Sequence, residues 1–124
     1  MMMNLWIPNK CSIINMFRGD SLDIPLDIRN GSAMHYEQYN LTNNDTIYFG
    51  LMEPNQKFED AILKKVLTIS DIDNDGNLIV KLEPIDTVDL LPGKYYYSIK
   101  LKQNSDNSYD VYTLLKETEF WILN

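Results

Sequence analysis

The sequence has one cysteine, one histidine and five glycines, none adjacent to another, among its 124 residues. Cys11 is therefore without a partner for an internal disulfide, and its apolar neighbours Ile13 and Ile14 predict a small buried thiol. His35 has no second histidine with which to hold zinc. The isolated glycines provide no glycine-rich phosphate loop. The sequence thus lacks the usual marks of metal, nucleotide and redox chemistry.

Basic residues are also scarce. The chain carries 11 Lys and Arg against 18 Asp and Glu, a net charge of −7, and Lys64-Lys65 is its only adjacent basic pair. Such a field repels nucleic-acid phosphates and anionic lipids, so neither nucleic acid nor a membrane is expected as a partner. The opening MMMNLWIPNK has no basic residue before its apolar run, and no apolar run reaches membrane-spanning length. We expect a protein that is made and used without translocation.

What the sequence does contain is period-two alternation beside turn signals. Leu22, Ile24, Leu26 and Ile28 alternate with polar residues, and Tyr95, Tyr97, Ile99 and Leu101 do the same after Pro92-Gly93. This pattern is typical of antiparallel strands with one buried face. Hydrophobic residues make up 44% of the chain, enough for one core in a domain of this length. The sequence predicts an all-β fold: a single antiparallel β-sandwich of about seven to eight strands over residues 11–124, preceded at 1–10 by an N-terminal arm or edge strand.

The predicted elements follow from local signals. Thr46 to Met52 is expected as a strand, with Gly50 marking a bulge or the close approach of another backbone. Residues 30–45 are expected as a long loop with one short strand around Tyr39 to Thr42. Lys65 to Ser70 and Leu78 to Leu82 are predicted to form a hairpin across a turn at Asp71 to Asn77. Pro84 to Leu91 is expected as a one-turn helix or a corner between sheets.

The acidic stretch from Asp71 to Leu78 resembles part of a calcium loop. Oxygen ligands occur at Asp71, Asp73 and Asp75, and glycine and an apolar residue occupy the next required places. The twelfth position is Leu82, and Glu83 comes one residue late, on the opposite face of a strand. A tight turn, in which the glycine of Asp-Gly adopts a positive φ, accounts for the same residues. We predict the turn, with weak calcium binding left as the alternative.

Other motifs favour ordinary structural roles. Arg18-Gly19-Asp20 lies between two strand-like runs and is interpreted as a turn. A triad of Ser32, His35 and Asp45 has no nucleophile elbow beside it, and the acidic residues lie mainly on turns and polar strand faces. We assign no catalytic, cofactor or metal residues, name no cofactor, and predict that the protein is not an enzyme. The many tyrosines are divided between core packing and exposed positions suited to a protein interface or a sugar platform.

Four segments in a fixed order carry a resemblance to a known family. They are the run from Ile13 to Ile28 with its Arg-Gly-Asp turn, LTNNDTIYFGLM at Leu41 to Met52, LIVKLEPIDTVDLLPGKYYYSIKL at Leu78 to Leu101 with a Leu-x-x-Gly-x-Tyr corner (Leu90, Gly93, Tyr95), and VYTLLKETEFWIL at Val111 to Leu123. Together they resemble the small β-sandwich virion proteins of tailed bacteriophages, in particular the N-terminal domain of upper baseplate proteins from phages of Gram-positive bacteria. The likeness covers nearly the whole chain from Ile13 onward.

The resemblance implies that the β-sandwich is immunoglobulin-like. It also implies a non-enzymatic structural protein that is made in the bacterial host cytoplasm and located in the virion. It would be present in multiple copies and dock on other virion proteins, in the tail and baseplate or as a capsid auxiliary or head-tail accessory. Sheet edges, loops and the apolar arm at Met1 to Pro8 would make the contacts, the arm by donating a strand to a neighbour. A carbohydrate-binding β-sandwich module that stacks sugars on tyrosines is the alternative function.

Overall fold

The computed structural model describes residues 3–8 and 12–124 of the chain. Strands hold 52% of the residues and helices 8%, which confirms the predicted all-β class. The strands within these ranges are β1 (Leu5–Trp6), β2 (Ile14–Phe17), β3 (Leu22–Pro25), β4 (Arg29–Gly31), β5 (Tyr36–Gln38), β6 (Asp45–Met52), β7 (Leu63–Leu67), β8 (Ile79–Leu82), β9 (Gly93–Ser105) and β10 (Ser108–Leu123). Three single-turn helices connect them: the 3-10 helices η1 (Phe58–Asp60) and η2 (Ile69–Asp71), and α1 (Pro84–Thr87).

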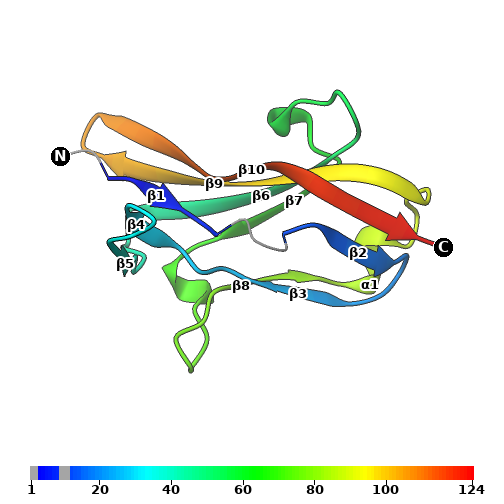
Figure 1. Ribbon diagram of the computed structural model, residues 1–124, viewed down its shortest axis with the longest axis horizontal. Helices are drawn as coiled ribbons and strands as arrows, with labels where there is room; N and C mark the ends of the chain where they lie inside the picture. Colours follow the sequence, from blue (N-terminus) through cyan, green and yellow to red (C-terminus); the bar gives the residue numbers. More distant parts are fainter. Residues whose placement is uncertain (1–2, 9–11) are drawn as a thin grey trace.

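The largest sheet has five strands in the order β2-β10-β9-β6-β7. Its central members are the long hairpin of β9 and β10, which runs the length of the molecule (Figure 1). All its pairings are antiparallel except one, because β2 runs parallel to the last strand, with Ile14 opposite Phe120 and Phe17 opposite Leu123. Register shifts after Thr113 and Leu115 bend β10. The irregularity lies within one continuous strand, from Ser108 to Leu123.

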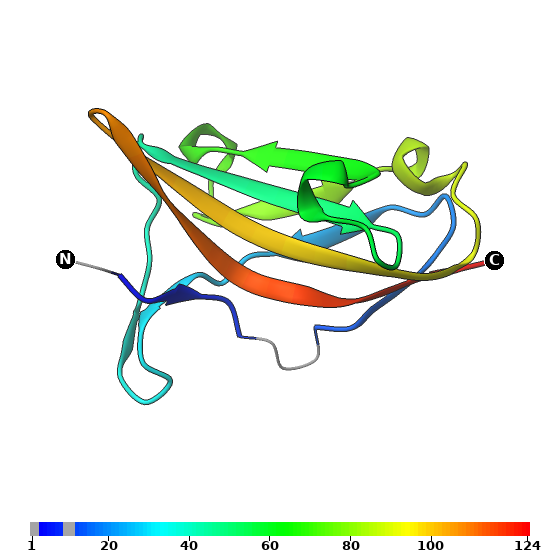
Figure 2. The ribbon, with the colours of Figure 1, turned by 90° about the horizontal axis from the view of Figure 1, so that it is seen from above.

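A two-stranded ribbon of β3 and β8 lies against one face of the five-stranded sheet (Figure 2). The core fills the space between these layers. From the ribbon it takes Val80 and Leu82, at 0% and 1% exposure, and from the sheet it takes aromatic residues such as Phe49 and Phe120. The predicted inward set of β9 is confirmed, since Tyr95, Tyr97, Ile99 and Leu101 are all 6% exposed or less. The opposite face of the five-stranded sheet has no strand layer over it among the described residues.

The predicted hairpin of β7 and β8 is wrong. β7 pairs with β6, with Tyr48 opposite Val66, and β8 pairs with β3, with Ile24 opposite Val80. The connection at residues 72–78 therefore crosses from one layer to the other. Alternation in each strand was predicted correctly because it depends only on which face is buried. The partner of a strand depends on layer packing, which alternation does not encode.

Residues 29–38 also differ from the prediction. The expected loop contains a hairpin of β4 and β5, which joins β1 in a small third sheet, while residues 39–42 form no strand. Tyr39 instead turns inward, where its hydroxyl binds the buried Asp45. The short strands of this third sheet raise the total in the described ranges to ten, above the expected seven or eight.

The described part of the N-terminal segment packs on its own chain. β1 pairs with β4, Leu5 is 4% exposed, and the Trp6 indole donates a hydrogen bond to the Gly31 carbonyl. Arg29 lies over the rings of Trp6 and Tyr36, at 5.5 and 4.2 Å from their centroids. These cation–π contacts attach the small sheet to the segment. Residues 3–8 therefore pack against their own chain through β4 and the core.

α1 lies where the sequence predicted a one-turn corner, and it carries the chain from the ribbon to the five-stranded sheet (Figure 1). Pro84 begins it, and Asp86 accepts a hydrogen bond from the Glu83 amide at its N-terminus. Lys65 on β7 forms a 2.8 Å ion pair with Asp86, which links the two layers. None of the helices in the described ranges is long and apolar enough to cross a lipid bilayer.

Candidate functional site

The acidic loop, residues 71–77, forms the turn that the sequence predicted. Asp73 Oδ1 accepts hydrogen bonds from the backbone amides of Asp75 at 3.0 Å and Asn77 at 2.9 Å. Gly76 has a φ of +82°, a conformation that glycine adopts without strain. Asp73 is thereby directed onto its own backbone. No group of three or more metal-ligating side chains occurs within residues 3–8 and 12–124.

The residues considered for a triad do not form one in the structure. His35 is exposed at the end of the β4–β5 hairpin, and its backbone amide, rather than its imidazole, binds Ser32 Oγ at 3.0 Å. Asp45 is 2% exposed and holds other partners. In the part of the chain that the structure describes, no hydrogen bond joins the His35 imidazole to Ser32 or Asp45.

Asp45 is the centre of a buried polar network. Its carboxylate accepts hydrogen bonds from the Tyr39 hydroxyl at 2.6 Å, the Thr42 amide at 2.9 Å and the Gln103 side-chain amide at 3.1 Å. Burial, and then the neighbouring carboxylate, raise the pKa of the Tyr39 phenol. The network fastens the entry of β6 to the end of β9. Its role is structural, because every oxygen is committed to a partner from the fold.

The Arg18-Gly19-Asp20 segment is the predicted turn. It joins β2 to β3, and Gly19 takes a φ of +82°. The Arg18 amide binds the Leu123 carbonyl at 2.8 Å, and the Gly19 amide binds the buried Thr87 Oγ1 at 2.9 Å. Cys11, predicted to be a small buried thiol, lies outside the described residues.

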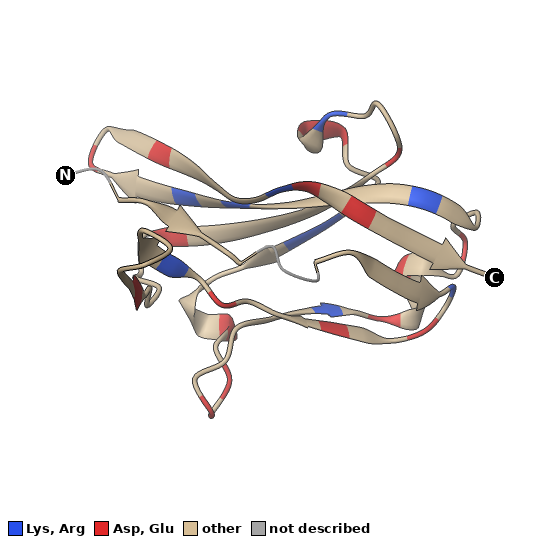
Figure 3. Cartoon of the chain, viewed as in Figure 1, with Lys and Arg blue, Asp and Glu red and all other residues tan. Residues whose placement is uncertain are grey.

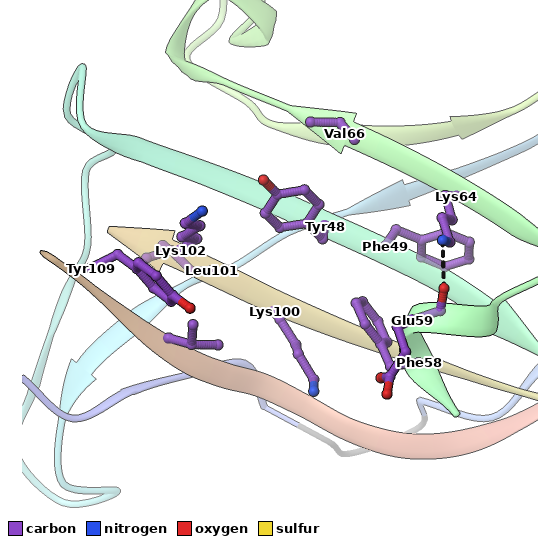
Figure 4. Close-up of a pocket in the computed structure, with 11 residues that line it drawn as sticks. Tyr48, Phe49, Phe58, Glu59, Lys64, Val66, Lys100, Leu101, Lys102 and Tyr109 are labelled. Carbon is purple, nitrogen blue, oxygen red and sulfur yellow. Dashed lines mark hydrogen bonds between the residues drawn. The ribbon is translucent and has the colours of Figure 1, made fainter. Parts of the chain in front are cut away.

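A groove of about 450 Å³ lies on the uncovered face of the five-stranded sheet (Figure 4). We call it the lysine groove. Strand register builds it: Val66, Tyr48 and Lys100 lie side by side across β7, β6 and β9, and Lys102 lies opposite Val111 on β10. Each of these side chains is on the outward position of its strand. The residues that line the groove are Tyr48, Phe49, Phe58, Glu59, Lys64, Val66, Lys100, Leu101, Lys102, Tyr109 and Val111.

Gly50 leaves space for the Phe58 side chain, which forms one wall of the groove. The expected bulge or close backbone is absent, since pairing runs unbroken through Gly50 on both sides. A side chain comes close instead: a Cβ at Gly50 would lie 2.8 Å from Phe58 Cε1 and 3.2 Å from Ala61 Cβ. The missing side chain thus makes room for the Phe58 ring, which η1 presents beside Lys100 (Figure 4).

The lysine groove is basic although the chain is acidic. Lys64, Lys100 and Lys102 line it with Glu59 as the only acid, whereas acidic residues predominate over the rest of the chain (Figure 3). Lys64 donates a 2.7 Å hydrogen bond to the Glu59 backbone carbonyl. The Lys100 ammonium lies 4.7 Å from the centre of the Phe58 ring, and that of Lys102 lies 4.4 Å from the Tyr109 ring. Within the described ranges, no carboxylate lies within 4.0 Å of any of these three lysines.

Exposed apolar groups complete this surface. Val66, Tyr109 and Val111 are 55%, 59% and 53% exposed. A carboxylate that entered the groove would meet ammonium groups already positioned over aromatic rings, while apolar atoms packed against the valines and tyrosines. The arrangement can therefore bind an acidic segment that also carries apolar surface.

No known protein-family model matches the sequence, and no match was found among curated proteins.

The lysine groove was not predicted from the sequence, where no basic patch was recognised. Lys64 is far from Lys100 and Lys102 along the chain, and only the pairing of β7, β6 and β9 brings it to them. A partial signal was available. Lys100 and Lys102 share the outward face of the best-defined strand, so two cations on one sheet face followed from the alternation alone.

Proposed function

We propose that the chain is a non-enzymatic docking module of a tailed-bacteriophage virion, with an immunoglobulin-like β-sandwich fold. The connectivity supports this fold. In variable-type immunoglobulin domains, strands B and E share one sheet and strands G, F, C and C′ the other. β3 and β8 correspond to B and E, and β10, β9, β6 and β7 to G, F, C and C′ in that order. The Tyr95 hydroxyl also donates a 2.6 Å hydrogen bond to the Leu91 carbonyl, as a tyrosine corner does at the start of strand F.

The docking role is carried by one observation, the uncovered sheet face with its lysine groove. Exposed apolar side chains and half-buried lysines occur together there, while the other face of the same sheet is closed by the ribbon. In the described structure β7 and β2 also pair on one side only, which leaves backbone groups for a neighbouring strand. The resemblance to upper baseplate modules supports a virion as the place of this docking.

The test is incorporation into particles. Phage particles purified from the bacterial host are analysed by quantitative mass spectrometry, and the chain is expected at many copies in a fixed ratio to a major virion protein. The variant K100Q/K102Q, which removes two charges of the groove, is expected to reduce incorporation. The matched control is K81Q, which removes an exposed lysine from the ribbon. Absence of the chain from intact particles would overturn the proposal, and neighbouring genes for capsid, portal or tail proteins would support it.

A carbohydrate-binding role is the second candidate, and the exposed Tyr109 ring beside Lys102 favours it. Aromatic rings stack on sugar faces, and a lysine beside one would add a contact to an acidic sugar. A glycan array probed with the purified chain distinguishes the two roles. Saccharide binding that is lost in Tyr109→Ala but kept in Tyr36→Ala would favour the carbohydrate role. Genes for polysaccharide degradation beside this one would do the same.

A further inference from the structure

We infer that the lysine groove takes the acidic loop of a second copy of this chain, so that copies join head to tail. The inference rests on the proposed function in one respect, because it treats the groove as a protein-docking surface. It goes further by naming the partner.

The groove has a charge that its own molecule does not balance. Lys100 and Lys102 face aromatic rings, and the carboxylates of residues 3–8 and 12–124 all lie beyond 4.0 Å from them. Both lysines are half-buried, and no carboxylate of the described residues pairs with their ammonium groups. An incoming carboxylate would form charge-assisted hydrogen bonds with them.

The acidic loop has the complementary chemistry. It carries Asp71, Asp73 and Asp75 with no basic residue, and it projects from the ribbon side of the molecule as a narrow finger (Figure 3). The two hydrogen bonds to Asp73 Oδ1 fix its shape before any contact is made. A preorganised loop loses little conformational entropy when it binds.

The positions of groove and loop determine how copies would join. The groove lies on the outer face of the five-stranded sheet, and the loop extends from the opposite layer (Figure 1). A molecule cannot fill its own groove, and two molecules that pair in this way still leave one groove and one loop free. Such a heterologous contact closes into a ring or continues as a filament. Multiple copies in one assembly, which the proposed function requires, follow from this geometry.

The experiment is sedimentation equilibrium of the purified chain at low and high salt, over a wide range of protein concentration. We expect association beyond a dimer that weakens as salt rises, because the contact is ionic. K100Q/K102Q removes cations from the groove. D73N/D75N removes anions from the loop, while the amide oxygen that replaces Asp73 Oδ1 still accepts the two backbone hydrogen bonds. Each variant alone is expected to lose about tenfold or more in its association constant. K81Q is the control that keeps it, and circular dichroism confirms that every variant is folded.

Mixing the two variants gives the decisive measurement. K100Q/K102Q still has its loop and D73N/D75N still has its groove, so the mixture has one working contact and is expected to stop at a one-to-one complex. A wild-type chain that stays monomeric, a D73N/D75N variant that associates normally, or a mixture that does not pair would each overturn the inference. Binding of poly-glutamate or an acidic saccharide by a monomeric wild-type chain would do so as well. If the purified chain stayed monomeric but still entered particles in a way that depends on the groove, the proposed function would stand and the head-to-tail inference would be wrong.

Discussion

The Tyr39 hydroxyl donates a 2.6 Å hydrogen bond to Oδ2 of Asp45, a residue that is only 2% exposed. Tyr39→Phe removes this donor and leaves the carboxylate with the Thr42 amide and Gln103. We expect the free energy of unfolding to fall by about 1–3 kcal/mol, the cost of an underpaired buried charge. Urea denaturation measures it.

Tyr36→Phe is the matched control, because the Tyr36 ring is 44% exposed on the small sheet. It should change the stability by less than about 0.5 kcal/mol. Equal effects of the two substitutions would show that the network around Asp45 contributes no specific stability.

Alkaline pH should destabilise the protein through Tyr97. Burial raises the pKa of its phenol to about 12, although the hydrogen bond to the Ser12 carbonyl acts in the opposite direction. The folded state therefore keeps this proton while the unfolded chain, with an ordinary pKa of 10.0, releases it. The contribution of Tyr97 to the free energy of unfolding is fully present below pH 10.0 and is lost as the pH rises towards about 12.

The measurement is urea unfolding at several pH values across that window. Tyr97→Phe should be less stable at neutral pH. Its free energy of unfolding should also fall less steeply with rising pH, with a slope that differs from that of wild type by up to about one bound proton. An unchanged slope would mean that Tyr97 does not titrate in the folded state as described.

The ion pair between Lys65 and Asp86 should give a dependence at acid pH. Burial alone would raise the pKa of the Asp86 carboxyl, but the hydrogen bonds from Lys65 and the Glu83 amide outweigh it and lower the pKa from 3.8. The contribution to stability is therefore present above pH 3.8 and lost as the pH falls through the lowered value. Lys65→Met should cost about 1–2 kcal/mol at neutral pH. The difference from wild type should shrink in strong acid, and a cost independent of pH would contradict the ionic explanation.

Gly50→Ala should disturb the wall of the lysine groove. Its new Cβ would lie 2.8 Å from the Phe58 ring, so the ring and η1 would have to move or the sheet distort, at a cost of about 1–3 kcal/mol. In a Phe58→Ala background the obstructing ring is gone, and the same substitution should cost less. Thermal unfolding of the four proteins of this cycle measures the coupling. Additive effects would mean that Phe58 does not lie over Gly50.

The sequence predicted what depends on one strand at a time. Alternation located the inward face of β9, and the proline and glycine signals located α1 and the turn at Arg18 to Asp20, because each reflects local burial or a local backbone requirement. It failed where two distant segments must meet. The turn residues from Asp71 to Asn77 fit a chain that turns back within one sheet and one that crosses to another sheet equally well. The β7–β8 hairpin was therefore a wrong interpretation. The lysine groove went unpredicted for the same reason.

The parallel pairing of β2 with β10 determines how the fold bears mechanical tension. Their four registered pairs, from Ile14–Phe120 to Phe17–Leu123, lie side by side with the strands pointing the same way. When the chain is pulled before Ile14 and after Leu123, in opposite directions, one strand slides along the other and all the hydrogen bonds between them are loaded together. In an antiparallel pair pulled at the same end, the bonds would instead break one after another. Rupture of the parallel pair needs every bond to fail at once, so the pair acts as a shear clamp against stretching.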